Sequence, residues 1–159
     1  MNPDQLLTAL IGAFFGAAGW LLVGIYLSRR QHDRQARNAA RAVYFELAMN
    51  EIDIDVAAEH NVFAALRRAS FDRLLPELAT WLEADELQTI ARAYMAHAGY
   101  EQLQRDGEIP PPVRAALMGR IRTENRDACA LLRRRAFTDR ERARLNLSSK
   151  PAGMKEDGA

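Results

Sequence analysis

The sequence predicts an all-α protein in which an N-terminal transmembrane helix continues into a cytoplasmic bundle of three or four helices. Residues Leu6–Leu27 form an uncharged run whose most polar side chain is Thr8. As a helix this run is about 33 Å long, enough to cross the hydrocarbon core of a bilayer. The roughly 130 residues after it suffice for one domain. They show helical spacing of apolar residues and no strand-like alternation.

The apolar run is expected to stay in the protein as an anchor and not to be cleaved as a signal peptide. Residues 1–5 contain Asp4 and no lysine or arginine, whereas a secretory signal begins with positive charge. The sequence Ser28-Arg29-Arg30 is a poor match to a small-residue cleavage site. We therefore expect a short extracytoplasmic N-terminus (residues 1–5) and a membrane span (residues 6–27).

A cluster of arginines follows the span and predicts its orientation. Because positively charged flanks stay in the cytoplasm, the main domain is expected there. The same side chains should contact anionic lipid headgroups, at about 1 kcal/mol each. The chain has 20 arginines and two lysines, which favours a GC-rich bacterial genome and hence a bacterial inner membrane. The cluster consists of Arg29, Arg30, Arg34, Arg37 and Arg41.

Small residues on the span offer a face for helix association. Gly12 and Gly16 form a G-x-x-x-G pair, and Gly19 extends the set. Small residues let transmembrane helices approach closely. Because glycine is also common in unpaired spans, association through this face and a neutral role both remain open.

The first bundle helix is expected to continue from the span to about His60, since residues 28–60 contain no proline or glycine. Apolar or small residues follow a 4-3 spacing there, which favours packing within a bundle over an independent coiled coil. The stripe consists of Ala36, Ala40, Val43, Leu47, Asn50, Ile54 and Ala57.

The next segment, residues 61–82, is less regular. Ser70 is a candidate helix cap, and Pro76 is expected to begin a second short turn because proline disrupts a helix interior. Bulky side chains from this segment should fill one end of the core: Phe71, Leu74, Leu78, Trp81 and Leu82.

Two longer helices should follow. One runs from about Ala84 to Arg105, with acidic residues in its first turn, and Gly107 and the prolines at 110–112 end it. Its expected inner face is Leu87, Ile90, Ala91, Tyr94 and Ala98. The other starts near Pro112, with an inner face of Val113, Leu117, Ile121, Ala128 and Leu132. The bundle is thus residues 28–136, and residues 137–159 are expected to be mostly a disordered tail.

Opposite charge blocks cancel to a net charge of +1. Residues 46–110 carry a net −8 and residues 113–144 a net +6. One interpretation is intramolecular, with acids of the first bundle helix (Glu46, Glu51, Asp53, Asp55, Glu59) beside the arginine-rich last helix. Others give the last basic block (Arg133, Arg134, Arg135, Arg140, Arg142, Arg144) a lipid or acidic-protein contact. A nucleic-acid contact is disfavoured because no stacking aromatics or known motif accompany these arginines.

No motif for catalysis, a cofactor, a metal or a small-molecule substrate emerges. The three histidines lack ligand spacing, and His97 reads as a packed, hydrogen-bonded residue. Cys129 reads as a small packing residue whose cationic neighbours could lower its thiol pKa. If an enzyme site exists, it would need Glu46, Asn50, Tyr94 and His97 to converge in a pocket.

One local pattern resembles a known group. Residues 41–50, RAVYFELAMN, follow the span directly. They resemble small uncharacterised bacterial membrane proteins that carry an R-A-x-x-x-E-L-x-x-N helix start. Trp81 and the Ala93-Tyr94 helix are similar to the helical part of those proteins. The resemblance implies a helical, membrane-tethered domain and no particular activity.

The sequence favours a non-enzymatic, single-pass inner-membrane protein whose cytoplasmic bundle binds another protein or its own copies. The alternative is a regulatory or phage-type accessory protein that acts on the bilayer itself. An enzyme with a polar site inside the bundle is a third hypothesis.

Overall fold

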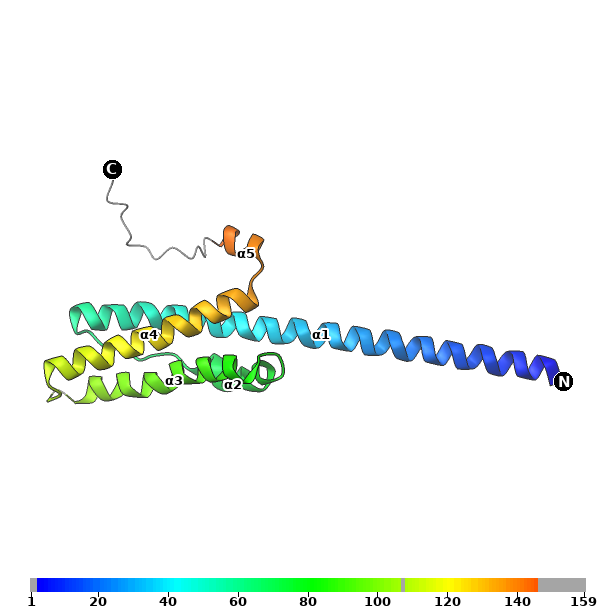
Figure 1. Cartoon of the computed structure of the whole chain (residues 1–159), viewed down its shortest axis with the longest axis horizontal. Coiled ribbons are helices and arrows are strands. Elements are labelled where there is room, and N and C mark those ends of the chain that lie inside the picture. Colours follow the sequence, from blue (N-terminus) through cyan, green and yellow to red (C-terminus); the bar gives the residue numbers. More distant parts are fainter. Residues whose placement is uncertain (1–2, 107, 146–159) are drawn as a thin grey trace. The chain divides into compact units, whose positions relative to one another are not determined.

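The computed structural model describes the backbone of residues 3–106 and 108–145, and the side chains of this part except residues 3–13 and 18. All regular secondary structure in this part is helical, which confirms the predicted all-α class. The chain divides into two compact units, one ending at Gln35 and one beginning at Ala36. The helices are α1 (Pro3–His60), α2 (Ala69–Ala79), α3 (Ala84–Arg105), α4 (Pro111–Ala136) and α5 (Asp139–Arg144) (Figure 1).

Within the residues that the structure describes, no helix combines the length and hydropathy needed to cross a membrane. Residues 6–13 and 18 of the predicted span lie outside the part of the chain whose side chains are described.

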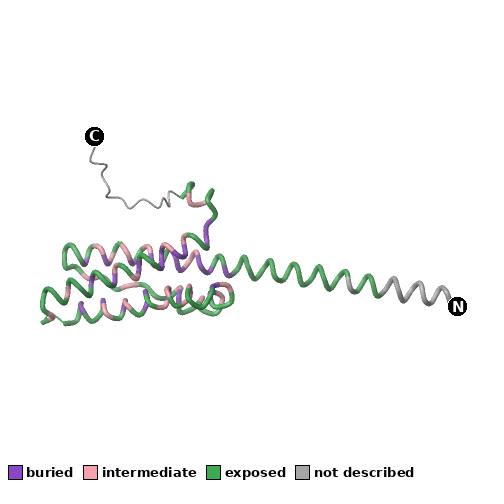
Figure 2. Tube along the Cα trace, in the orientation of Figure 1, coloured by how far each residue is buried: buried purple, intermediate pink, exposed green. Residues whose placement is uncertain are grey.

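The bundle unit is built on the part of α1 from Ala36 onward. All seven positions of the predicted 4-3 stripe are buried, each at most 4% exposed, which confirms the stripe. Figure 2 shows buried positions recurring along the bundle part of α1. Alanines in the stripe bring the α1 backbone close to its neighbours, while Val43, Leu47 and Ile54 fill the space between them.

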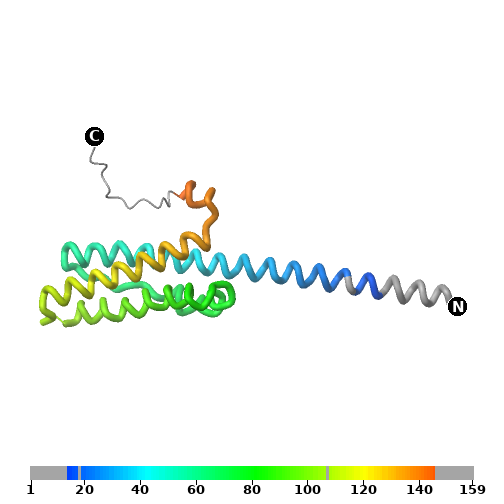
Figure 3. The backbone as a smooth tube through the Cα atoms, viewed as in Figure 1, coloured from blue at the N-terminus to red at the C-terminus, as the bar shows by residue number. Residues whose placement is uncertain are grey.

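The α1 helix ends in a left-handed residue. Asn61 has φ 55° and its N–H donates to the Ala57 carbonyl at 3.0 Å. Asparagine is one of the few residues other than glycine that adopts this conformation readily. The non-helical linker of residues 61–68 then leads to α2 (Figure 3).

Two predictions for α2 are wrong. Ser70 does not cap the helix: α2 begins at Ala69, and the residue before it, Arg68, supplies no side-chain cap. Pro76 does not begin a new turn but lies inside α2. Its missing N–H costs one helical bond, and burial of Phe71 and Leu78 on either side of it holds the helix together. The five predicted bulky side chains do join the core, Leu74 and Trp81 only partly buried.

The α3 helix has the predicted bounds. Glu83 and Glu86 form a reciprocal capping box at its N-terminus. The predicted inner face is rotated, however: Ala98 is exposed, and the buried face is Ile90, Ala93, Tyr94, His97, Tyr100 and Leu103. Gly107 lies outside the described residues.

The α4 helix starts with two prolines, which need no N–H partner in the first turn. Val113 and Leu117 were expected in its inner face but are 49% and 39% exposed. The face that packs on α1 and α3 begins instead at Met118 and continues through Ile121, Asn125, Ala128, Cys129, Leu131, Leu132 and Ala136.

The structure describes a further helix inside the segment expected to be a tail. Phe137 is 6% exposed and packs edge-on against Tyr44. The short helix α5 follows, with Thr138 and Glu141 forming a capping box. Residues 146–159 of the expected tail lie outside the described residues.

Candidate functional site

Glu46 of α1 caps the N-terminus of α2 from the neighbouring helix. Its carboxylate accepts hydrogen bonds from the backbone N–H groups of Ser70 at 2.7 Å and Phe71 at 3.3 Å. It also accepts from the Tyr94 hydroxyl of α3 at 2.6 Å. Negative charge is favourable at a helix N-terminus, and α2 has no local cap. One buried side chain therefore joins three helices.

Asn50, one turn further along α1, fixes the linker between α1 and α2. Its amide oxygen accepts from the Arg67 N–H and its amide nitrogen donates to the Arg67 carbonyl, both at 2.8 Å. The side chain is fully buried. The two bonds satisfy both backbone groups of a residue that has no helical partners. The Asn50 amide therefore bonds to the Arg67 backbone in the way that a neighbouring β-strand would.

Arg41, one turn before Glu46, fixes the other end of the bundle. Its Nε donates to the Ala136 carbonyl at 3.0 Å, and its Nη2 pairs with Glu141 at 2.5 Å. The guanidinium also lies 5.3 Å from the centre of the Phe137 ring. The three polar residues of the R-A-x-x-x-E-L-x-x-N pattern thus all hold other segments onto α1.

A second polar group crosses the core between α3 and α4. The Asn125 amide nitrogen donates to the Leu47 carbonyl at 3.1 Å, so its oxygen is left to accept from His97 Nε2, also at 3.1 Å. His97 Nε2 therefore carries the donated proton, and its buried Nδ1 has no hydrogen-bond partner among the described residues. Burial lowers the pKa of His97, which agrees with a neutral ring. The structure thus confirms His97 as a packed, hydrogen-bonded residue.

The four residues of the enzyme hypothesis are brought together only in part. Glu46 bonds to Tyr94, and the Tyr94 and His97 rings touch edge-on, but Asn50 serves the linker. Burial raises the pKa of Tyr94. All four side chains are at most 8% exposed, and none lines the two surface pockets described below. Their contacts are those of structural hydrogen bonds.

Cys129 is confirmed as a packing residue. It lies in the core with Leu47 and Tyr94, and burial raises the pKa of its thiol to about 12. The cationic neighbourhood expected to lower this pKa is present through Arg133, but its effect is smaller than that of burial. Among the described residues, no group of three or more His, Cys, Asp or Glu side chains is placed to hold a metal ion.

Two pockets lie on the outer surface of α3 and α4. The first, of about 540 Å³, is polar and lined partly by Asp85, Glu86 and Asp127 with Arg92 and Arg134. The second, of about 270 Å³, is more apolar, with Met95, Gly99 and Leu117 in its wall. Sequence reasoning did not predict either, since residues of each come from both helices.

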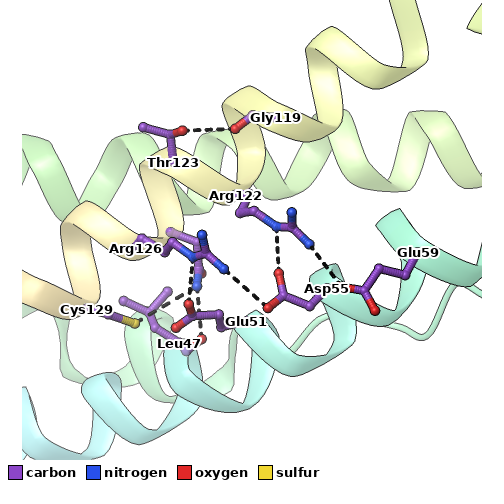
Figure 4. A network of polar contacts seen from close by, with 10 residues as sticks. Leu47, Glu51, Asp55, Glu59, Gly119, Arg122, Thr123, Arg126 and Cys129 are labelled. Atoms are coloured by element: carbon purple, nitrogen blue, oxygen red, sulfur yellow. Dashed lines mark hydrogen bonds and ion pairs between the residues drawn. The ribbon is translucent and has the colours of Figure 1, made fainter. Parts of the chain in front are cut away.

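The predicted contact between acids of α1 and arginines of α4 is confirmed for Glu51, Asp55 and Glu59, whereas Glu46 caps α2 and Asp53 pairs with Arg67 of the linker. Figure 4 shows Arg122 and Arg126 reaching from α4 toward the carboxylates of α1. Arg126 pairs with Glu51 at 2.8 Å and with Asp55 at 3.3 Å. Arg122 Nε lies 2.6 Å from Asp55 Oδ1, and its Nη2 lies 4.0 Å from Glu59. These pairs are partly exposed, so each contributes about 0.2–1 kcal/mol.

An exposed apolar line runs along α1 on the side away from the core. It consists of Phe45, Met49, Ile52 and Val56, which are 49%, 47%, 58% and 39% exposed. We call these four residues the outer stripe. Their 4-3-4 spacing is visible in the sequence, but only the buried stripe was predicted.

The residues predicted to face the membrane differ in their surroundings. Arg29, Arg30, Arg34 and Arg37 are exposed, whereas Arg41 is held in the bundle. Side chains added at Gly16 or Gly19 would meet no other atom of the described residues within 4 Å. Gly12 lies outside the residues whose side chains are described.

In comparisons with known proteins, no protein family, curated protein or solved structure matches this chain.

Proposed function

We propose that this protein is a single-pass inner-membrane protein whose cytoplasmic helical bundle binds a protein partner. The supporting observation is the surface of the N-terminal unit. Large apolar side chains there remain 46–83% exposed and are left uncovered by the part of the chain that the structure describes: Phe14, Phe15, Trp20, Leu21, Leu22, Val23, Ile25, Tyr26 and Leu27. Extended apolar surface of this kind marks a membrane or protein contact.

The end of this surface has the composition of a membrane interface. The Arg30 guanidinium lies 5.7 Å from the centre of the Tyr26 ring, one turn away. Tyrosine and arginine together are common where a span leaves the hydrocarbon region. The next basic residues, Arg34 and Arg37, are exposed and available to headgroups.

Within the described residues, the bundle offers binding surface and no assembled reaction centre. Its buried Glu46 and Asn50 are hydrogen-bonded to other segments of the bundle, and the outer stripe leaves apolar area on α1 exposed. This combination favours an interaction domain over an enzyme, because an enzyme needs titratable groups that a substrate can reach.

Membrane fractionation tests the tether. The full chain should remain in bacterial membranes after alkaline carbonate extraction. A variant carrying Phe15→Arg and Gly16→Arg, near the middle of the span, should be released, since each central arginine costs about 2.5–3.5 kcal/mol of insertion. Release of the unmodified chain would refute the tether.

Reporter fusions test the orientation. A C-terminal fluorescent protein should fold and fluoresce, and a C-terminal alkaline phosphatase should be inactive. The reverse result would place the bundle outside the cytoplasm. Replacing Arg29, Arg30 and Arg34 by glutamine serves as the control, because it should weaken the bias that the arginines impose.

A further inference from the structure

The outer stripe of α1 has the geometry of a helix-pairing seam. Its residues recur at intervals of four, three and four, which averages close to the 3.5-residue repeat of paired helices. At 100° per residue they lie within a narrow arc, opposite the buried positions Val43, Leu47 and Ile54. Within the described part of the bundle unit, α1 therefore has one apolar face covered by its own chain and one largely exposed, where the Phe45 ring meets the Phe137 ring edge-on at 5.9 Å.

The same spacing extends the outer stripe toward the N-terminus by two uncharged positions. These are Ala42, which lies three residues before Phe45 and is half-buried, and Asn38, which lies four residues before Ala42 and is exposed. Charged residues of this part of α1, such as Arg37 and Asp53, lie off this line. An identical seam can therefore lie against it without opposing like charges, which would be destabilising.

We propose that the partner of this face is a second copy of the chain, paired in parallel and in register along residues 38–56 of α1. This deepens the proposed function by naming its partner and rests on it. Parallel, in-register pairing places Asn38 against its own copy at the N-terminal end of the seam. A polar asparagine in an apolar seam is a known device for fixing register. Antiparallel pairing centred on the outer stripe would place it beyond the helix end.

The size of the seam explains why the tether matters to the pairing. Nineteen helical residues are about 28 Å long. A seam of this length falls short of the roughly 800 Å² per partner of a standard stable interface. Confinement of both copies to one membrane raises their effective concentration, which lets a weak seam pair. Pairing should therefore be strong in the membrane and weak in dilute detergent.

Site-directed disulfide cross-linking of the full chain in native membranes tests this proposal. Ile52→Cys introduces a thiol in the seam, and Ala58→Cys introduces one on an exposed position of α1 outside it. The unmodified chain is the background control, since Cys129 is buried. After mild oxidation, Ile52→Cys should give at least fivefold more covalent dimer than Ala58→Cys at equal expression.

Further variants test whether the cross-linked dimer could instead result from misfolded chains or from random collisions in the membrane. Adding Met49→Glu to Ile52→Cys should abolish the dimer, because it places like charges opposite each other in the seam. Met49 is 47% exposed, so this change leaves the buried core in place. Equal cross-linking at Ile52→Cys and Ala58→Cys would overturn the second-copy proposal. So would dimer formed only between Phe45→Cys and Val56→Cys chains, which would mean antiparallel pairing. Absence of the chain from the membrane fraction would instead refute the tether itself.

Discussion

Replacing Glu46 by alanine should open the bundle far more often than any surface change on α1. The change removes three acceptor contacts at once: those to Ser70 N, Phe71 N and the Tyr94 hydroxyl. The hydroxyl belongs to a side chain 1% exposed, and leaving such a donor unpaired costs about 1–3 kcal/mol. Loss of the α2 cap adds about 1 kcal/mol. The expected destabilisation is about 3 kcal/mol.

The single cysteine provides the assay. Cys129 is buried in the same core as Phe71 and Tyr94, and the pKa of its thiol is raised to about 12. A thiol reagent can therefore label it only when the bundle opens. If reclosing is faster than labelling, the rate follows the opening equilibrium. A loss of about 3 kcal/mol in the free energy of opening should raise the labelling rate roughly 100-fold. A labelling rate that is linear in reagent concentration verifies that reclosing is faster than labelling.

Two further variants sharpen the result. Glu59→Ala is the matched control on the same helix: Glu59 is 67% exposed and 4.0 Å from its partner, so labelling should change less than threefold. Adding Tyr94→Phe to Glu46→Ala should recover part of the loss, because it removes the orphaned hydroxyl. Labelling of Glu46→Ala within threefold of Glu59→Ala would refute the capping role.

Three other changes probe the remaining polar contacts. Asn50→Ala should cost about 2 kcal/mol and make the linker at Arg67 sensitive to trypsin, measured as a faster first cleavage of the full chain. Arg126→Glu should destabilise the bundle by about 1 kcal/mol in denaturant melts, and by less at high salt. Adding Glu51→Arg to the same chain should restore part of this stability, and no restoration would contradict the Arg126–Glu51 pair. Because burial lowers the pKa of His97 in the folded state, the unfolded chain binds its proton first. Stability should therefore be full above the ordinary histidine pKa of 6.5 and fall as pH drops below it; His97→Gln should flatten this slope in unfolding measured at pH 5 and pH 7.

Sequence patterns predicted this fold best where one helix carries its own signals. The buried stripe of α1 and the bounds of α3 follow from local spacing, capping acids and prolines, and the structure confirms both. Predicted faces were rotated where polar residues belong to the core. His97 and Asn125 lie on the true seam between α3 and α4, and a search for apolar residues alone passes over them.

The missed features depend on contacts between elements distant in sequence. Pro76 stays inside α2 because tertiary burial and the Glu46 cap compensate for one lost bond. The polar residues of the motif were visible in the sequence, but their partners lie 17 to 100 residues away. No periodicity encodes such partners, so the roles of Arg41, Glu46 and Asn50 required the structure.

The cap of α2 has a consequence for the order of folding. An 11-residue helix with an internal proline and no cap of its own is too short to persist alone in water. It gains its cap from α1 and the buried contact of Phe71 from the Tyr94 ring of α3, which stacks on it at 4.2 Å. The two long helices must therefore meet before α2 forms. We therefore expect the residues of α2 to become helical only once α3 has packed on α1.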